Sequence, residues 1–434
     1  MPKLVINPNF CKSCGYCVMF CPRKILKIGE EINANGYPYV MQTEPENCIG
    51  CAICCSMCPE GPSSSISKEA PMSNKVFMKG CEAIAEAAVR AGCRFYAGYP
   101  ITPQNEIPEY MARRLPQVGG VFVQGESEIA SVNMVYGAGG GGTRSMTSSS
   151  SVGISLKSEG ISYCAGAKVP MVYVNMQRGG PGVGTIQAAQ QDYFQATKAS
   201  GNGGFRMIVL APSTVQEAVD MTYEAFDLAE RDRSPVLILG DGVIGTIMEP
   251  VVLPEMKSDE EVAALKAKNR EWAIVGHSRE EKRGFLDPGF WSLEMQEAHC
   301  RELDAMYRRW EENDVQVEEL CLEDAELVFV AYGTSARIAR SALELLRAEG
   351  LKVGMIRPKT VSPFPVKSFD KINYDLCRCV LDIEMSIPAQ MVYDVKLALK
   401  ERCPVDTCLR SGGNLIERDD IIRKVHEILN GGAK

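Results

Sequence analysis

The chain has 434 residues, of which 45% are hydrophobic and 24% are charged. This composition excludes fibrous and disordered proteins and leaves room for about two to four domains. Acidic residues outnumber basic ones by 55 to 47, for a net charge of -8, so we expect no nucleic acid as a partner. No apolar run approaches the roughly 20 residues of a membrane span, and the N-terminus lacks the pattern of a secretory signal. We therefore expect a cytoplasmic protein with no membrane contact.

Half of the cysteines lie at the start of the chain, nine of 18 within the first 58 residues. Residues 11–22 and 48–59 both read C-x2-C-x2-C-x3-C-P, the spacing of bacterial two-cluster ferredoxins. There, each cluster binds three cysteines of one repeat and the last cysteine of the other. We expect two [4Fe-4S] clusters, one on Cys11, Cys14, Cys17 and Cys58 and one on Cys48, Cys51, Cys54 and Cys21.

The alternative for this repeat is a pair of zinc sites. Such sites need only C-x2-C pairs, so they leave the third cysteine and the Cys-Pro of each repeat unexplained. Cys55 is surplus to either scheme and is interpreted as a packing residue. Residues 1–70 are thus predicted to form a small α+β ferredoxin-like domain, and the Ser-, Pro- and Gly-rich residues 60–74 a linker.

Residues 71–250 are predicted to form an α/β domain with a parallel sheet. The pattern indicates helices at 77–91, 103–115, 126–137, 152–165 and 213–230, and strands at 93–97, 120–124, 170–176, 206–210 and 235–239. Strands that alternate with helices of this length form parallel sheets covered on both faces. Such sheets bind ligands beyond the C-terminal ends of their strands, so the loops there are the candidate site.

Three of these loops carry polar side chains. Thr102 follows the first strand and, taken alone, reads as the N-cap of a helix that starts at Pro103. Glu126 and Glu128 open the next helix, where carboxylates are favoured for structural reasons too. Arg178 lies among glycines at the end of a strand, which suits a guanidinium that binds a carboxylate.

Together these loops resemble the alpha subunit of the 2-oxoacid:ferredoxin oxidoreductases, which are thiamine diphosphate enzymes. The resemblance covers nearly the whole chain. It rests on Tyr99-Pro-Ile-Thr-Pro103, Glu126-Ser-Glu128, Met146-Thr-Ser-Ser-Ser-Ser151, Arg178-Gly-Gly-Pro-Gly182 and Gln191-Asp192. Residues 98–110 and 192–198 are most similar to the branched-chain (2-oxoisovalerate) type.

The resemblance implies a role for each site residue. Glu128 would hydrogen bond N1′ of the aminopyrimidine and so promote loss of the thiazolium C2 proton, with Glu126 as the fallback. Tyr99 and Pro100 would line the cofactor. Thr102 and Arg178 would hold the 2-oxocarboxylate of the substrate. The implied reaction is oxidative decarboxylation of a 2-oxoacid, with coenzyme A taking the acyl group and electrons leaving through the clusters to ferredoxin.

The diphosphate half of the cofactor site is missing from the sequence. Gly240-Asp-Gly242 imitates the start of the motif that binds Mg²⁺ and diphosphate, but no Asn-Asn pair follows at about 25 residues. We therefore expect a beta subunit to supply this motif, and a gamma subunit to complete the complex. Residues 240–245 also fit G-x-G-x-x-G, but a poor helix start follows, which argues against nicotinamide binding.

The last two segments are a charged arm and a second α/β domain. Fourteen of residues 255–283 are charged, so 251–322 is interpreted either as an arm that packs on a partner or as solvated helices. Residues 323–434 alternate strand and helix, with helices expected at 335–348, 387–400 and 417–429, and resemble the transketolase C-terminal domain. Within it, Ala331-Tyr-Gly-Thr-Ser335 is expected to cap a helix, with an anion cradle as the less favoured reading.

Two other functions stay open at this stage. One is an electron-transfer protein whose larger domain only docks partners. The other keeps the enzyme but changes its substrate to 2-oxoglutarate, pyruvate or an aryl 2-oxoacid.

Overall fold

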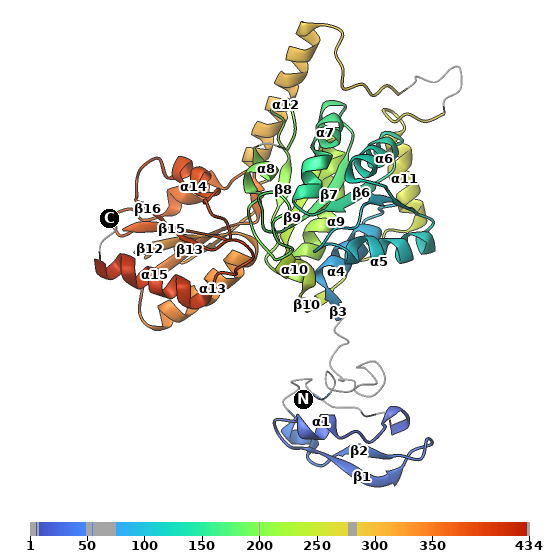
Figure 1. Cartoon of the computed structure of the whole chain (residues 1–434), viewed down its shortest axis with the longest axis vertical. Coiled ribbons are helices and arrows are strands. Elements are labelled where there is room, and N and C mark those ends of the chain that lie inside the picture. The colour runs from blue at the N-terminus through green and yellow to red at the C-terminus, as the bar shows by residue number, and fades with distance from the viewer. Residues whose placement is uncertain are drawn as a thin grey trace. The chain divides into compact units, whose positions relative to one another are not determined.

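The computed structural model describes residue 6 and residues 8–48, 54, 75–198, 200–276 and 284–431. The chain forms two compact units, Met1–Lys75 and Val76–Lys434 (Figure 1). Within the described ranges, no helix is both long and apolar enough to cross a membrane.

The N-terminal unit is built around a β-hairpin and short helical turns. Strands β1 (Leu26–Ile32) and β2 (Pro38–Gln42) pair antiparallel, beside helix α1 (Tyr16–Met19) and the 3-10 turns η1 (Pro8–Phe10) and η2 (Pro45–Asn47). Asn33 at the hairpin donates from Nδ2 to the carbonyls of Pro8 (2.8 Å) and Cys11 (2.7 Å). These bonds tie the turn of the hairpin to the first cysteine motif.

The centre of the larger unit is a seven-stranded sheet in the order β14-β8-β9-β7-β6-β4-β5. Its parallel strands are β4 (Phe95–Gly98), β5 (Val121–Gln124), β6 (Ser145–Ser149), β7 (Met171–Gln177), β8 (Ile208–Leu210) and β9 (Pro235–Asp241). The edge strand β14 (Thr360–Ser362) is antiparallel to β8 and comes from the C-terminal part of the chain. The predicted parallel sheet is therefore present.

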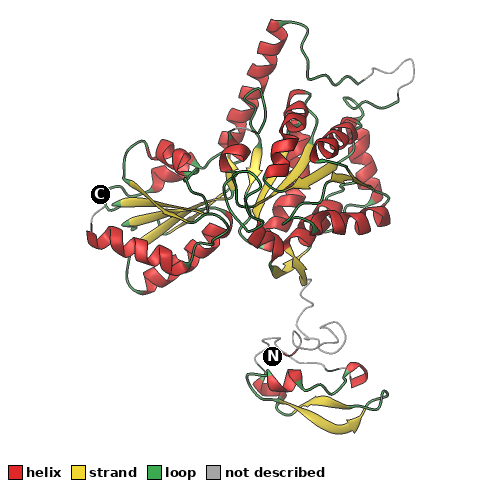
Figure 2. Ribbon diagram, viewed as in Figure 1, coloured by secondary structure: helices red, strands yellow, loops and turns green. Residues whose placement is uncertain are grey.

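Helices cover both faces of this sheet (Figure 2). They are α4 (Gly80–Arg90), α5 (Glu106–Arg114), α6 (Glu128–Gly140), α7 (Val152–Gly166), α8 (Tyr193–Thr197), α9 (Val215–Asp232) and α10 (Gly242–Thr246). Alternate residues of β7 face the two helix layers. Tyr173 packs with Val132 and Ile154 on one face of the sheet, whereas Val174 belongs to the hydrophobic core on the other face. A strand buried on both faces needs apolar residues at nearly every position, which is why β7 was predictable from sequence.

A second sheet of five strands follows, in the order β11-β13-β12-β15-β16. Its members are β11 (Val317–Leu320), β12 (Leu327–Val330), β13 (Val353–Pro358), β15 (Cys379–Glu384) and β16 (Val405–Leu409), with only β11 antiparallel. Helices α13 (Gly333–Ala348), α14 (Val392–Leu399) and α15 (Arg418–Gly431) and the 3-10 turn η4 (Val366–Lys371) flank it. The described chain thus carries the predicted second α/β domain.

The arm between the two sheets is helical and largely exposed. Strands β10 (Met248–Val252) and β3 (Lys75–Lys79) form a small sheet, and helices α11 (Asp259–Asn269) and α12 (Leu293–Asn313) follow. A capping box between Ser258 and Glu261 starts α11. The far end of α12 is anchored because the buried Trp310 donates from Nε1 to the Asp232 carboxylate at 2.8 Å.

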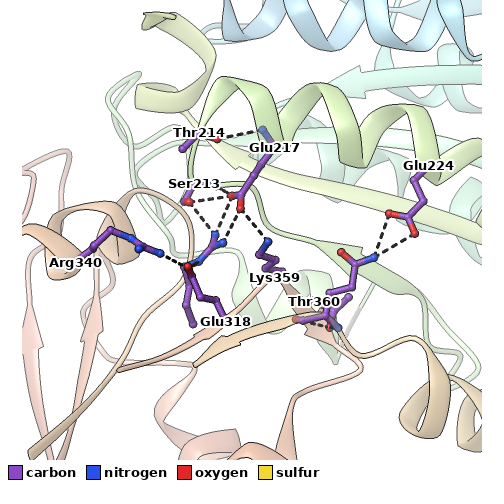
Figure 3. A network of polar contacts seen from close by, with 10 residues as sticks. Ser213, Thr214, Glu217, Glu224, Glu318, Arg340, Lys359 and Thr360 are labelled. Atoms are coloured by element: carbon purple, nitrogen blue, oxygen red, sulfur yellow. Dashed lines mark hydrogen bonds and ion pairs between the residues drawn. The ribbon is translucent and has the colours of Figure 1, made fainter. Parts of the chain in front are cut away.

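A network of polar contacts joins the two sheets (Figure 3). Arg357 on β13 is almost fully buried and forms ion pairs with Glu217 on α9 (2.6 Å) and Glu318 on β11 (2.7 Å). The Ser213 hydroxyl and the Lys359 ammonium also contact Glu217. This network fixes the C-terminal sheet against the helix layer of the central sheet.

Candidate functional site

The predicted site residues lie at the C-terminal ends of the parallel strands, as expected for this type of sheet. Tyr99 and Pro100 directly follow β4 and are exposed, Tyr99 at 37%. Thr102 lies further along the same loop, Glu128 is the first residue of α6, and Arg178 follows β7. The structure joins two of these loops directly: Arg178 donates from Nη1 to the Thr102 carbonyl at 3.1 Å.

Glu128 is held by the first turn of α6. Ser127 is the N-cap, its hydroxyl accepting from the main-chain N–H of Ala130, so the chain turns and Glu128 points inward. Its side chain is only 5% exposed, whereas Glu126 is exposed. The one hydrogen bond of its carboxylate within the described chain comes from the Ser149 hydroxyl, at 3.5 Å. A buried carboxylate with so few partners has acceptor capacity left for a ligand.

A glycine makes room for this carboxylate. A Cβ atom at Gly153, in the first turn of α7, would lie 2.5 Å from Glu128 Oε1 and would also collide with Ser149 Oγ. The helix can therefore approach Glu128 only without a side chain at this position. Ser149, Gly153 and Glu128 form what we call the Glu128 cluster.

The N-cap interpretation of Thr102 is wrong. Helix α5 starts at Glu106 with Asn105 as its N-cap, because residues 102 and 103 form a separate turn. Asn105 donates instead from Nδ2 to Thr102 Oγ1 at 3.3 Å. Thr102 Oγ1 accepts in this bond, so its hydroxyl proton remains available to an acceptor.

Arg178 is buried and partly satisfied by its own loops. Its Nη2 donates to the Val183 carbonyl at 3.1 Å, but its Nε has no partner among the described residues. The hydroxyl of the fully buried Ser150 has none either. Unpartnered buried polar atoms are uncommon in a folded protein, and two that directly follow the neighbouring strands β6 and β7 are consistent with a polar ligand there.

A polar network that the sequence analysis did not predict supports the Arg178 loop. The Ser151 hydroxyl lies 2.6 Å from the Asp192 carboxylate and accepts from the main-chain N–H of Arg178 at 3.0 Å. Asn175 donates to Asp192 at 2.9 Å. Burial raises the pKa of Asp192, opposed by these bonds. Ser151 has a φ of 31°, a strained conformation that clusters at functional sites.

Asp241 forms hydrogen bonds through its carboxylate to other residues of this chain. Its carboxylate caps α10 by accepting from the N–H groups of Val243 (3.0 Å) and Ile244 (3.2 Å), and it accepts the Thr334 hydroxyl at 2.8 Å. It is 1% exposed. The Gly240-Asp-Gly242 motif therefore has a structural role, and a protein carboxylate, not a bound anion, meets the start of α13.

Six of the eight predicted cluster ligands are described, and Cys51 and Cys58 lie outside the described residues. Cys11, Cys21, Cys48 and Cys54 pack against a small core that contains Cys17. Within the described part, no three metal-binding side chains converge on one point. Thiols gathered in an apolar surrounding are the donor set that iron-sulfur clusters need.

Comparison with protein-family models gives three matches along the chain. Residues 86–314 match "Pyruvate flavodoxin/ferredoxin oxidoreductase, thiamine diP-bdg". Residues 325–421 match "Pyruvate:ferredoxin oxidoreductase core domain II", and residues 10–61 match a 4Fe-4S dicluster domain. The last of these supports the two-cluster assignment over the pair of zinc sites.

Two curated relatives are similar over most of the chain. The ketoisovalerate oxidoreductase subunit VorB of Methanothermobacter marburgensis is 46% identical over 351 residues, which are 81% of this chain and 97% of that protein. The 2-oxoglutarate synthase subunit KorA of Methanocaldococcus jannaschii is 36% identical over 368 residues, covering 80% of this chain and 98% of that protein.

A solved structure has the same fold. It is a 2-oxoglutarate:ferredoxin oxidoreductase from Magnetococcus marinus, with a TM-score of 0.72 and 24% identity, covering 86% of this chain and 68% of that one. From these matches, and from a glutamate buried at the strand ends of a thiamine-diphosphate-binding domain, the chain belongs to the 2-oxoacid:ferredoxin oxidoreductases, as a subunit with an N-terminal 4Fe-4S domain.

Proposed function

We propose that this subunit, with its partners, oxidatively decarboxylates branched-chain 2-oxoacids, with 3-methyl-2-oxobutanoate as the preferred substrate. The 2-oxoacid and coenzyme A would give acyl-CoA, CO₂, one proton and two electrons, and the electrons would pass singly through the two clusters to ferredoxin. The 46% identity to a ketoisovalerate oxidoreductase subunit supports this substrate class. The observation that carries the catalytic part is the Glu128 cluster, in which a buried carboxylate has a single described partner.

The chain's own residues would divide the work as follows. Thiamine diphosphate, when bound, supplies an acidic carbon that adds to the 2-oxo group. Glu128 would hold the proton at N1′ of the aminopyrimidine, and Tyr99 and Pro100 would line the ring. Arg178 and Thr102 would orient the substrate carboxylate. The Arg178–Thr102 hydrogen bond and the unpartnered Arg178 Nε support this pairing.

The rest of the cofactor site would come from other chains. The Asp241 carboxylate already accepts hydrogen bonds from Val243 and Thr334. This supports a beta subunit that carries the Mg²⁺ and diphosphate motif. A gamma subunit and ferredoxin would complete the assembly, in the cytoplasm. We further propose that residues 1–70, 71–250, 251–322 and 323–434 are the functional divisions of this subunit.

The second candidate substrate is 2-oxoglutarate. The 36% identity to a 2-oxoglutarate synthase subunit favours it, and pyruvate or an aryl 2-oxoacid would use the same chemistry. The choice would depend on the residues that surround the side chain of the bound 2-oxoacid, to which a partner subunit would contribute.

The test is anaerobic. The chain is purified with whatever co-purifies, and coenzyme A-dependent reduction of a low-potential acceptor is followed across a panel of 2-oxoacids. We expect the highest kcat/KM with 3-methyl-2-oxobutanoate, and about eight iron atoms per chain. A clear preference for 2-oxoglutarate would move the assignment to that substrate. Inactivity towards every 2-oxoacid, with clusters intact and a thiamine-binding partner present, would leave an electron-carrier subunit.

A further inference from the structure

Lys157 is a lysine buried inside the larger unit, next to Glu128. It lies on α7 and its side chain is 0% exposed. Lysine is almost never fully buried without a charged partner, because its ammonium group loses its hydration. Within the described chain, its Nζ makes two hydrogen bonds and no ion pair, to Thr147 Oγ1 at 2.9 Å and to the main-chain carbonyl of Glu128 at 3.4 Å.

The packing around Lys157 is tight on both sides. Gly153 and Gly160 precede and follow it by four and three residues, so all three lie on one face of α7. A Cβ at Gly153 would lie 2.5 Å from Glu128 Oε1, and a Cβ at Gly160 would lie 2.5 Å from Val132 Cγ1. Helices α6 and α7 therefore meet closely above and below the lysine, which reaches the main chain of the first turn of α6.

The electrostatics of the two side chains are linked. Burial lowers the pKa of Lys157 to about 7, and the charge of Glu128 opposes that shift. Around the lysine, α6 contributes the charge of Glu128, while β6 contributes the Thr147 and Ser149 hydroxyls. The charges of the Lys157 ammonium group and the Glu128 carboxylate therefore attract each other inside the protein.

We propose that Lys157 is a positioning residue for Glu128: it fixes the first turn of α6 through the Glu128 carbonyl and brings the charge of its ammonium group to bear on the Glu128 side chain. This inference rests on the proposed role of Glu128 in activating the cofactor. A residue that only filled space could be an apolar side chain of the same length, such as methionine. The chemistry of Nζ, and not its volume, is what the site would use.

The first test is a pH profile of kcat/KM on the co-purified complex. Lys157→Met keeps the volume and removes a positive charge from the site, so the acid limb of the profile should move to higher pH and kcat/KM on that limb should fall. Lys157→Arg should restore part of the acid limb. Lys266→Met, the same change at an exposed lysine of α11, is the matched control and should leave the profile unchanged.

The second test needs no cofactor. The melting temperature of the full chain is measured against pH for wild type, Lys157→Met and Lys266→Met. An unfolded lysine keeps its proton up to about pH 10.5 but the folded Lys157 only to about 7, so the lysine makes wild-type stability rise with pH across this window. Lys157→Met should therefore melt higher than wild type at pH 7 and below, and the gain should shrink towards pH 10.

The outcomes separate this inference from the proposed function. If Glu128→Gln is inactive while Lys157→Met keeps the wild-type acid limb and shows no pH-dependent gain in melting temperature, the role of Lys157 is overturned and the proposed function stands. If the Lys157→Met chain fails to assemble with its partners, the melting curves of the chain alone, measured without cofactor, still test the inference. Full activity of Glu128→Gln would overturn the proposed role of Glu128, and the inference about Lys157 with it.

Discussion

The Thr334 hydroxyl donates to the Asp241 carboxylate at 2.8 Å, which joins the last residue of β9 to the first turn of α13. The main-chain N–H of Thr334 points to the same carboxylate, at 3.3 Å. Both residues are buried. The two α/β domains are thus connected through one acidic side chain, in the position where an isolated helix start would bind an anion.

Replacing Thr334 by valine should destabilise the protein. The change keeps the shape of the side chain but removes one donor from a buried carboxylate, which costs about 1 to 3 kcal/mol. Chemical denaturation against wild type measures the loss. Thr246→Val is the matched control, since the Thr246 hydroxyl is exposed and bonds only within α10, and its effect should stay within about 0.5 kcal/mol.

Glu128→Gln should reduce turnover by about 10²- to 10⁴-fold, the contribution typical of a positioned acid-base group. The side chain keeps its size and its place in the Glu128 cluster, so thiamine diphosphate should still bind; calorimetric titration of the cofactor into the complex checks this. Glu126→Gln is the control, because Glu126 is exposed. Loss of activity in that variant instead would assign the role to Glu126.

Gly153→Ala should impair catalysis more than it impairs folding. The added Cβ would lie 2.5 Å from Glu128 Oε1, so the carboxylate must move away from its position over Ser149. We expect kcat to fall while the chain stays folded by circular dichroism. Gly137→Ala on α6 meets nothing within 4 Å and should stabilise the helix by up to about 1 kcal/mol without a change in kcat.

The sequence predicted most strands and helices because their signals are local. Strand β7 is apolar throughout and α9 is amphipathic, so each can be recognised from its own residues. Strand β6 was not predicted: its residues Ser145–Ser149 are mostly polar yet entirely buried. Their hydroxyls are satisfied by residues distant in sequence, such as Tyr96 and Gln104 for Ser148, and no local pattern shows that.

Besides the start of α5, two further helix starts were placed wrongly, because contacts with distant parts of the chain set them. A helix was expected at 387–400, but α14 begins at Val392 because the Glu384 carboxylate of β15 accepts from the N–H groups of Gln390 and Val392. A helix was expected at 77–91, but residues 75–79 form β3 and α4 begins at Gly80. The site residues themselves were found through motif resemblance, whereas Lys157 carries no motif and becomes visible only through its burial.

The Glu217–Arg357 pair should make stability depend on pH in acid (Figure 3). Burial alone would raise the pKa of Glu217, but the hydrogen bonds and charge of Arg357 and the bonds from Ser213 outweigh it and lower this pKa to about 2. An unfolded glutamate has a pKa of about 4.5. The pair therefore contributes its full stability above about pH 4.5, and the contribution is lost as the pH falls towards 2.

Glu217→Gln should accordingly lose on the order of 2 kcal/mol of unfolding free energy at pH 7, with the gap to wild type closing between pH 4.5 and 2. The measurement is the difference between the two proteins in parallel denaturation series, so acid loss of the clusters affects both alike. Glu224→Gln is the control, because Glu224 is exposed and its described partner is the neutral Gln316. A gap of the same size for both variants, or one independent of pH, would contradict the assignment of this stability to the buried ion pair.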